Sequence, residues 1–284
     1  MKNFGEFLIE TSFKTYMPQE PICEIYHYTS LNSIKSILFD DKDIENITLW
    51  ASRYDCLNDV SEGSIAQKVY LDICYELYKR KEINEELFEF LKEITETDKS
   101  LFYKEINNTV KGQYLPNDRY ITSFSLNGDS LAMWNYYSKG SKNEGCNIMM
   151  LASELYEGLL KTCNNKVVKI NTYPVIYDKA KQKDIVRSFL KQALEFYNIH
   201  KNEIKNIISD FLLDCGLIFK SEHFKHEEEV RIIVDIPKST SETALGNNFF
   251  EVKYRVSYGY IVPYIELKIP KECLGMGFIN FFFA

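Results

Sequence analysis

Apolar residues recur along the chain at two different spacings, which predict a protein built from both strands and helices. Alternating or β-branched apolar stretches predict strands at about residues 24–28, 47–52, 120–125, 145–151, 167–177, 228–236, 249–256 and 260–269. Apolar residues three or four positions apart predict short helices at 31–38 and 130–137, and two longer helical blocks at about 64–100 and 184–215. Helical blocks that interrupt a series of strands favour an α+β fold.

The organisation of the chain predicts one domain. Residues 1–20 form a lead-in that is helical or irregular and stops at two prolines, Pro18 and Pro21. No internal repeat and no low-complexity linker follows. We therefore predict a single α+β domain over residues 21–284.

Charge and cysteine content narrow the classes of partner. The 284 residues include 34 Lys and Arg against 41 Asp and Glu, a net charge of −7, and no basic run offsets it. A general nucleic-acid binder would show a basic stripe, so we expect no general nucleic-acid binding. The charge remains compatible with a small nucleotide ligand. The seven cysteines are dispersed and none forms a C-x-x-C pair. Together with the lack of an 18-residue apolar run, this predicts a soluble cytoplasmic protein with free thiols and no membrane partner.

The first group of candidate residues lies where the strand at 24–28 meets a helix. Strand alternation places Ile25 and His27 on one face and the tyrosines at 26 and 28 on the other. The hydroxyls of Thr29 and Ser30 and the start of the helix face an open end where an anion could sit. Tyr28 is one of the aromatic residues expected to touch a ligand. The alternative is that His27 is a histidine satisfied by a backbone carbonyl and that Thr29 is a helix cap.

Two further groups follow a strand. Asn58 and Asp59 either shape a ligand loop or make Asx turns, which is the commoner use of such residues at a strand end. In the helix at 130–137, Met133, Trp134 and Tyr137 share one face and could form an aromatic wall. A stripe of methionine and aromatic residues is more often part of the core than of a ligand site, so the core is the favoured interpretation.

The fourth group is the most informative. Alternation in the strand at 228–236 sends Val230 and its apolar neighbours to a buried face, and so sends Glu227, Glu229 and Arg231 to the other face. A carboxylate held by arginine stays ionised and is suited to stabilising a developing cation or accepting a hydrogen bond from a sugar hydroxyl. The alternative is a solvated edge strand with a self-neutralising row of charges.

Other chemistries lack their minimal signatures. The sequence contains no G-x-S-x-G, P-loop or G-x-G-x-x-G motif. The pair His223 and His226 adjoins a predicted strand, and no cysteine pair supports a metal site there, so no metal ligand is predicted.

Taken in order, these motifs resemble a bacterial family, the Domain of Unknown Function 2971 (DUF2971), over about residues 24–269. The motifs that carry the resemblance are Tyr26-His27-Tyr28-Thr29, Leu49-Trp50-Ala51-Ser52, Leu57-Asn58-Asp59 with Glu62, Ser123-Phe124-Ser125, Met133-Trp134 with Tyr137, Gly145-Cys146, Val175-x-Tyr177 and Glu227-x-Glu229-x-Arg231. The chain departs from the family pattern at Val60, where proline is usual, at Phe224, where tryptophan is frequent, and in a short or divergent C-terminus.

A looser resemblance is to ADP-ribosyltransferases, in the order of a His-x-Thr strand start, a middle aromatic residue and a late strand with glutamate. This resemblance implies a mixed or antiparallel split β core beside the two helical blocks. It also implies NAD as substrate, with His27 contacting the nicotinamide ribose, Tyr137 or Trp134 stacking on nicotinamide, and Glu229, oriented by Arg231, steadying the oxocarbenium-like centre.

The resulting hypothesis is an ADP-ribosyltransferase-like enzyme or NAD glycohydrolase, acting as an effector of a bacterial toxin or phage-defence system. Its catalytic residues would be His27, Tyr137 and Glu229. The alternative is a noncatalytic module that binds a nucleotide or a protein partner. A third class, a nucleic-acid-processing enzyme built on the carboxylates, would depend on a divalent metal.

Overall fold

A computed structural model of the chain describes residues 4, 22–38, 45–56, 62–98, 117–137, 144–163, 169–237, 250–257, 259–273 and 279–283. By their internal contacts the residues form two compact units. The helical unit comprises residues 1–19, 59–113 and 175–224, and the sheet unit comprises residues 20–58, 114–174 and 225–284. The single domain predicted for residues 21–284 stays a prediction.

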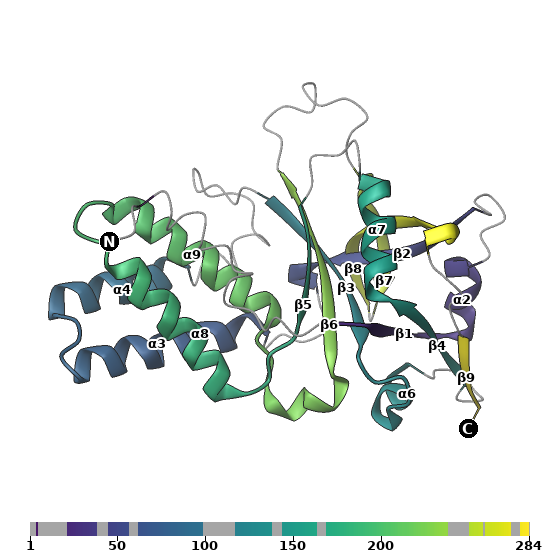
Figure 1. Cartoon of the computed structure of the whole chain (residues 1–284), viewed down its shortest axis with the longest axis horizontal. Helices are drawn as coiled ribbons and strands as arrows, with labels where there is room; N and C mark the ends of the chain where they lie inside the picture. Colours follow the sequence, from purple (N-terminus) through teal and green to yellow (C-terminus); the bar gives the residue numbers. More distant parts are fainter. Residues whose placement is uncertain are drawn as a thin grey trace, which may run out of the picture. The chain divides into compact units, whose positions relative to one another are not determined.

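The helical unit contains the two predicted helical blocks (Figure 1), in α3 (Glu62–Lys79), α4 (Glu85–Asp98), α8 (Lys179–Leu194) and α9 (Lys201–Ile218). Helix α8 starts at Asp178, whose side chain accepts a hydrogen bond from the backbone N–H of Lys181. The rings of Phe189 and Phe211 stack between α8 and α9 at 3.6 Å. The helices therefore bury their apolar stripes against one another.

In the described part of the chain, the sheet unit is built on nine antiparallel strands. They are β1 (Glu24–Ser30), β2 (Asn46–Arg53), β3 (Asn117–Ser125), β4 (Glu144–Leu151), β5 (Lys169–Pro174), β6 (Glu229–Pro237), β7 (Lys253–Ser257), β8 (Tyr260–Pro270) and β9 (Ile279–Phe283). Every pair between these strands is antiparallel. The α+β class is confirmed.

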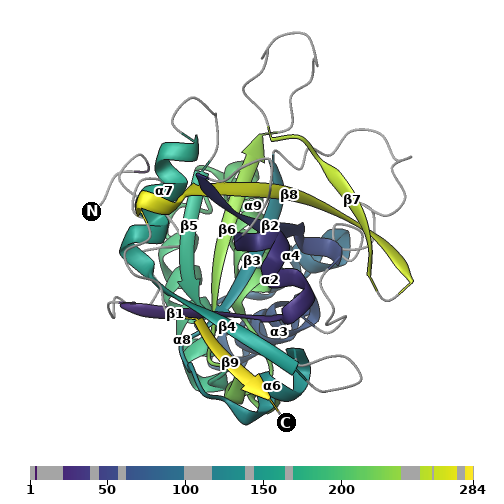
Figure 2. The ribbon, with the colours of Figure 1, turned by 90° about the vertical axis from the view of Figure 1, so that its right-hand side faces the viewer.

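The strands form one open antiparallel sheet, which branches at β3. One edge of β3 pairs with β6 along its whole length, and β5 follows beyond β6. The other edge is shared, because Tyr120 and Ile121 pair with β2 whereas Ser125 pairs with Tyr26 of β1. Two arms result, β2-β8-β7 and β1-β4-β9, and Figure 2 shows them running in different directions.

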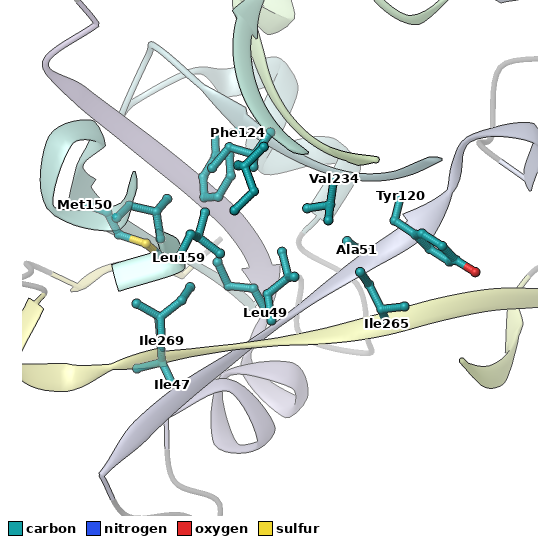
Figure 3. Packing of buried hydrophobic residues seen from close by; sticks show 14 of the residues in the cluster. Ile47, Leu49, Ala51, Tyr120, Phe124, Met150, Leu159, Val234, Ile265 and Ile269 are labelled. Atoms are coloured by element: carbon teal, nitrogen blue, oxygen red, sulfur yellow. The ribbon is translucent and has the colours of Figure 1, made fainter. Parts of the chain in front are cut away.

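The core of the sheet unit lies on one face of the sheet, under α2 (Leu31–Leu38) and α7 (Ala152–Cys163). Figure 3 shows strand residues that fill it, including Leu49, Phe124 and Val234. A third helix, α6 (Leu131–Tyr137), packs on β1 and β4 with a separate small cluster of Tyr28, Met133 and Trp134. The short stretches η2 (Tyr54–Cys56), η3 (Glu222–Glu227) and η4 (Lys271–Cys273) are 3-10 turns.

Two elements of the sheet unit were not predicted. Helix α7 follows β4 without a loop, so no cap or turn residue marks its start, although Leu155, Leu159 and Cys163 are buried at helical spacing. Strand β9 pairs with β4 from Glu144 to Ile148. The divergent C-terminal sequence therefore continues the sheet.

Candidate functional site

Residues from four strands share the sheet face that lies opposite the core. Directly paired residues of antiparallel strands point to the same face. The Cα pairs of β1 with β4, and of β3 with β6, therefore place one set of side chains together, namely Tyr28 with Asn147, Ser125 with Glu229, and Ser123 with Arg231. We call this side of β1, β3, β4 and β6 the α6 face, because α6 packs on part of it.

Tyr28 anchors the aromatic residues of this face. Its ring meets that of Trp134 edge to face at 4.7 Å and that of Tyr137 at 6.3 Å. Its hydroxyl donates to the carbonyl of Asn127 at 2.8 Å and accepts from the N–H of Ser130 at 3.0 Å. Burial raises the pKa of this phenol, while the Ser130 bond lowers it. Tyr28, Trp134 and Tyr137 are called the aromatic group below.

Only one member of the aromatic group is exposed. Trp134 is 4% exposed, and its indole N–H donates to Asp129 at 2.9 Å. Tyr28 is likewise buried, whereas Tyr137 is 42% exposed. The core interpretation of the methionine and aromatic stripe therefore holds for Met133 and Trp134, and Tyr137 is the ring that a ligand could reach.

The loop between β3 and α6 is fastened to the start of β6. The Ser125 hydroxyl donates to the carbonyl of Glu227 at 2.7 Å, and the amide of Asn127 donates to the Glu228 carboxylate at 3.0 Å. The backbone N–H of Leu126 donates to the carbonyl of Glu228 at 2.8 Å. Because these bonds link positions about 100 residues apart in sequence, they fix where β6 begins relative to α6.

Glu229 and Arg231 form a buried ion pair on the α6 face. Arg231 donates to both carboxylate oxygens of Glu229, from Nε at 2.8 Å and from Nη2 at 3.1 Å. The two residues are 7% and 3% exposed. Since β6 lies between β3 and β5, the alternative of a solvated edge strand is wrong. A bidentate pair of this kind holds the carboxylate ionised and fixed in direction.

Glu227 lies just before the start of β6. It ends the 3-10 turn η3, and the next residue, Glu228, has a left-handed backbone with φ of 43°. That change of direction breaks the alternation before β6 starts at Glu229. The strand register therefore covers Glu229 and Arg231, and the carbonyl of Glu227, just before the strand, accepts a hydrogen bond from Ser125.

His27 points to the face opposite Glu229. Its Cα partner is Ile148, a core residue, and its ring lies 5.5 Å from that of Phe124. The ring Nδ1 is 3.2 Å from the carbonyl oxygen of Ser123. Burial lowers the pKa of His27, and the bond to Ser123 opposes that shift. The expected alternation of β1 is confirmed, and it separates His27 from the aromatic group.

The remaining predicted residues are Thr29 and Ser30 of the first group and Asn58 and Asp59 of the second. Thr29 is buried and pairs with Cys146 of β4. Ser30 caps α2, because its Oγ accepts from the N–H of Ser33 at 3.3 Å. Asn58 and Asp59 lie outside the described residues.

Sequence reasoning did not select several residues that hold this face together. Asn147 is fully buried in β4, and its amide donates to the carbonyl of Gly128 at 2.6 Å. A polar residue inside an apolar strand was the available signal. Tyr136 and His226, joined at 3.0 Å between the hydroxyl and Nε2, come from elements about 90 positions apart and carried no such signal.

A pocket of about 570 Å³ lies at the α3–α4 turn. None of the predicted site residues lines it; its lining residues are Tyr78, Lys79, Lys81, Glu82, Ile83, Asn84 and Glu85. Among the described residues, no three His, Cys, Asp or Glu side chains gather where they could hold a metal ion. Within the same residues, no helix combines the length and apolarity needed to span a bilayer.

Fold and site together define an α+β protein with an open antiparallel sheet, whose α6 face carries an aromatic group and a buried carboxylate–guanidinium pair. Residues 133–232 match the model of a family described as Protein of unknown function (DUF2971). The match includes Trp134, Tyr137, Glu229 and Arg231, and it confirms the family resemblance over these residues, about a third of the chain. No curated protein and no solved structure matches the chain.

Proposed function

We propose that the protein is a NAD-using enzyme of ADP-ribosyltransferase type, a transferase or glycohydrolase, that serves as an effector in a bacterial toxin or phage-defence system. One observation carries the proposal. The strand β3 has β1 on one edge and β6 on the other, so that the aromatic group and the Glu229–Arg231 pair belong to the same sheet face. An aromatic ring and an oriented carboxylate are the two groups that this chemistry needs.

In the proposed reaction, the bond between the nicotinamide nitrogen and C1′ of the ribose breaks, and nicotinamide leaves with the electron pair. The positive charge that develops on the ribose is stabilised by the Glu229 carboxylate. Arg231 is a positioning residue, because its two bonds fix both oxygens of that carboxylate. A nucleophile, either water or an acceptor group, then forms the new bond to C1′.

The aromatic role falls to Tyr137, the exposed ring of the aromatic group. The ring of Tyr28 lies next to it, with 6.3 Å between the ring centroids. His27 takes a positioning role in place of the predicted ribose contact, because its ring bonds the β3 backbone at Ser123 on the other face.

Release of nicotinamide from NAD tests the proposal. We expect release by the full chain, and a loss of about 10²- to 10³-fold in Glu229→Gln, as for other groups that stabilise transition-state charge. Glu228→Gln is the matched control, since it removes a neighbouring carboxylate that is exposed and keeps an amide oxygen for Asn127. No release by the wild-type chain would reject an enzymatic role, and equal release by Glu229→Gln would reject the role of Glu229.

A specific observation favours a second candidate, a noncatalytic module that binds a nucleotide or a protein partner. Both Glu229 oxygens are bound by Arg231 within a buried pair, and the Tyr28 hydroxyl already serves Asn127 and Ser130. Such groups stabilise a binding surface without reacting. Saturable NAD binding without turnover, weakened by Tyr137→Ala, or tight co-purification with one protein, would select this candidate.

A further inference from the structure

An arginine without a carboxylate partner lies on the other arm of the sheet. Arg255 of β7 places its guanidinium carbon 5.3 Å from the ring centre of Trp50 and 5.8 Å from that of Tyr264. The two rings lie 4.7 Å apart, and they come from β2 and β8, the strands next to β7. A fourth residue, Ser52, accepts a hydrogen bond from Nη2 of Arg255 at 2.9 Å.

Within the described part of the chain, no carboxylate balances the charge of Arg255. Among the described residues, no acidic side chain forms an ion pair with it, and its Nε is buried without an acceptor. Burial lowers the pKa of this guanidinium, and no carboxylate opposes that shift. The next same-facing residue of β7 differs, since Lys253 is paired with Glu266 at 2.7 Å. Of these two cations of β7, Lys253 has a carboxylate partner among the described residues and Arg255 has none.

Aromatic rings explain how Arg255 is held but not what neutralises it. A cation within about 6 Å of a ring centre gains on the order of 0.5–2 kcal/mol and keeps its full charge. The planar guanidinium presents several N–H donors in the geometry that phosphate and carboxylate groups match. Trp50 beside it is 40% exposed, so solvent reaches the rim of this cluster.

We propose that Arg255, with Ser52 and the rings of Trp50 and Tyr264, forms a binding site for the oxyanion of a small molecule, a phosphate or a carboxylate. The guanidinium supplies the charge and the donors, and the two rings hold it in place. The chain has a net charge of −7, which disfavours nonspecific anion binding, so an anion that binds here is selected by this cluster. The site is independent of the function proposed for the α6 face.

The two tryptophans allow a direct test. The chain contains only Trp50 and Trp134, so a nitrogen-15 correlation spectrum of the full chain has two indole signals, which Trp50→Phe assigns. We expect titration with inorganic phosphate or with acetate, against chloride at equal ionic strength, to shift the Trp50 signal saturably and to leave the Trp134 signal in place. The stronger of the two titrants identifies the oxyanion as phosphate or carboxylate.

Substitutions separate the site from general electrostatics. Arg255→Gln is expected to weaken anion binding by about 10- to 100-fold, the value of a hydrogen bond to a charged group. Lys253→Gln removes the same charge from the same strand but leaves Glu266 unpaired, so it is expected to weaken anion binding clearly less than Arg255→Gln. Arg255→Lys keeps the charge and guards against loss of folding, and it should bind more strongly than Arg255→Gln. Equal weakening by Lys253→Gln, or no saturable shift with either anion, overturns the proposal.

Discussion

Gly128 lies in the β3–α6 loop against the ring of Tyr26. A Cβ atom at this position would stand 2.5 Å from the nearest carbon of that ring, well inside van der Waals contact. The carbonyl of the same residue accepts the Asn147 bond. The lack of a side chain is therefore what lets the loop approach β1 and β4 closely.

We expect Gly128→Ala to lower the free energy of unfolding by about 1–3 kcal/mol, the usual cost of inserting a methyl group into a packed contact. Denaturant unfolding measures it. The double variant Gly128→Ala with Tyr26→Ser lacks the ring, so it should recover most of the unfolding free energy that Gly128→Ala loses. Additive losses in that double variant would show that the contact with Tyr26 is not the cause.

The ion pair on β6 also makes a prediction for single residues. Removing one partner leaves the other charge buried, so Arg231→Met is expected to cost about 3–5 kcal/mol of unfolding free energy. Replacing both residues with methionine should cost clearly less than Arg231→Met alone, because no unpaired charge remains. Thermal unfolding of the two variants makes the comparison. A double variant as unstable as the single one would show that further partners of these side chains dominate.

At the scale of elements, β1 presents two tyrosines to the same face with different tasks. The hydroxyl of Tyr28 joins β1 to the β3–α6 loop through Asn127 and Ser130, while that of Tyr26 donates only to nearby Glu24. Of the two tyrosines, Tyr28 is therefore the one whose hydroxyl links β1 to this loop. This difference provides a matched pair of substitutions.

Tyr28→Phe is expected to cost about 1–3 kcal/mol, since the N–H of Ser130 is left without its acceptor in a buried place. Tyr26→Phe should stay within about 0.5 kcal/mol, as is usual for surface changes. Hydrogen exchange at the Ser130 amide should accelerate in the first variant alone. Unchanged exchange there would contradict the assigned link between β1 and α6.

At the scale of the whole molecule, His27 makes stability depend on pH. Its pKa is lowered by burial from 6.5, so the unfolded chain binds more protons below that value. Stability should therefore be complete above pH 6.5 and fall as the pH drops toward the folded pKa. Asp235 has the opposite effect on stability. Burial raises its pKa above 3.8, so the folded state holds the proton more tightly and stability falls as the pH rises above that value.

The contribution of His27 is isolated by comparing unfolding free energies of the wild type and His27→Gln between about pH 5 and 7.5, the range where histidine titrates. The slope with pH is expected to be smaller in the variant. His223→Gln, at an exposed histidine of η3, should keep the wild-type slope. An unaltered slope in His27→Gln would assign the pH dependence to other groups.

Much of the local structure follows from residue spacing. Alternation correctly separated His27 from Tyr28 on β1, and Val230 from Arg231 on β6, because successive side chains of any strand point to opposite faces. The start of β6 could not be obtained in this way, because the left-handed turn at Glu228 interrupts the period. Helix α7 was missed because it follows β4 directly, without a turn signal.

By itself, the sequence determined the α+β class, the alternation of faces along β1 and β6, and the residues of the aromatic group. Only the tertiary structure decided which strands are neighbours, since pairing joins segments that no local period connects. It put β5 beside β6 and so buried the Glu229–Arg231 pair, and it brought Arg255 to Trp50 across some 200 positions of sequence. Burial and charge compensation depend on those neighbours, which is why they could not be obtained from spacing along the chain.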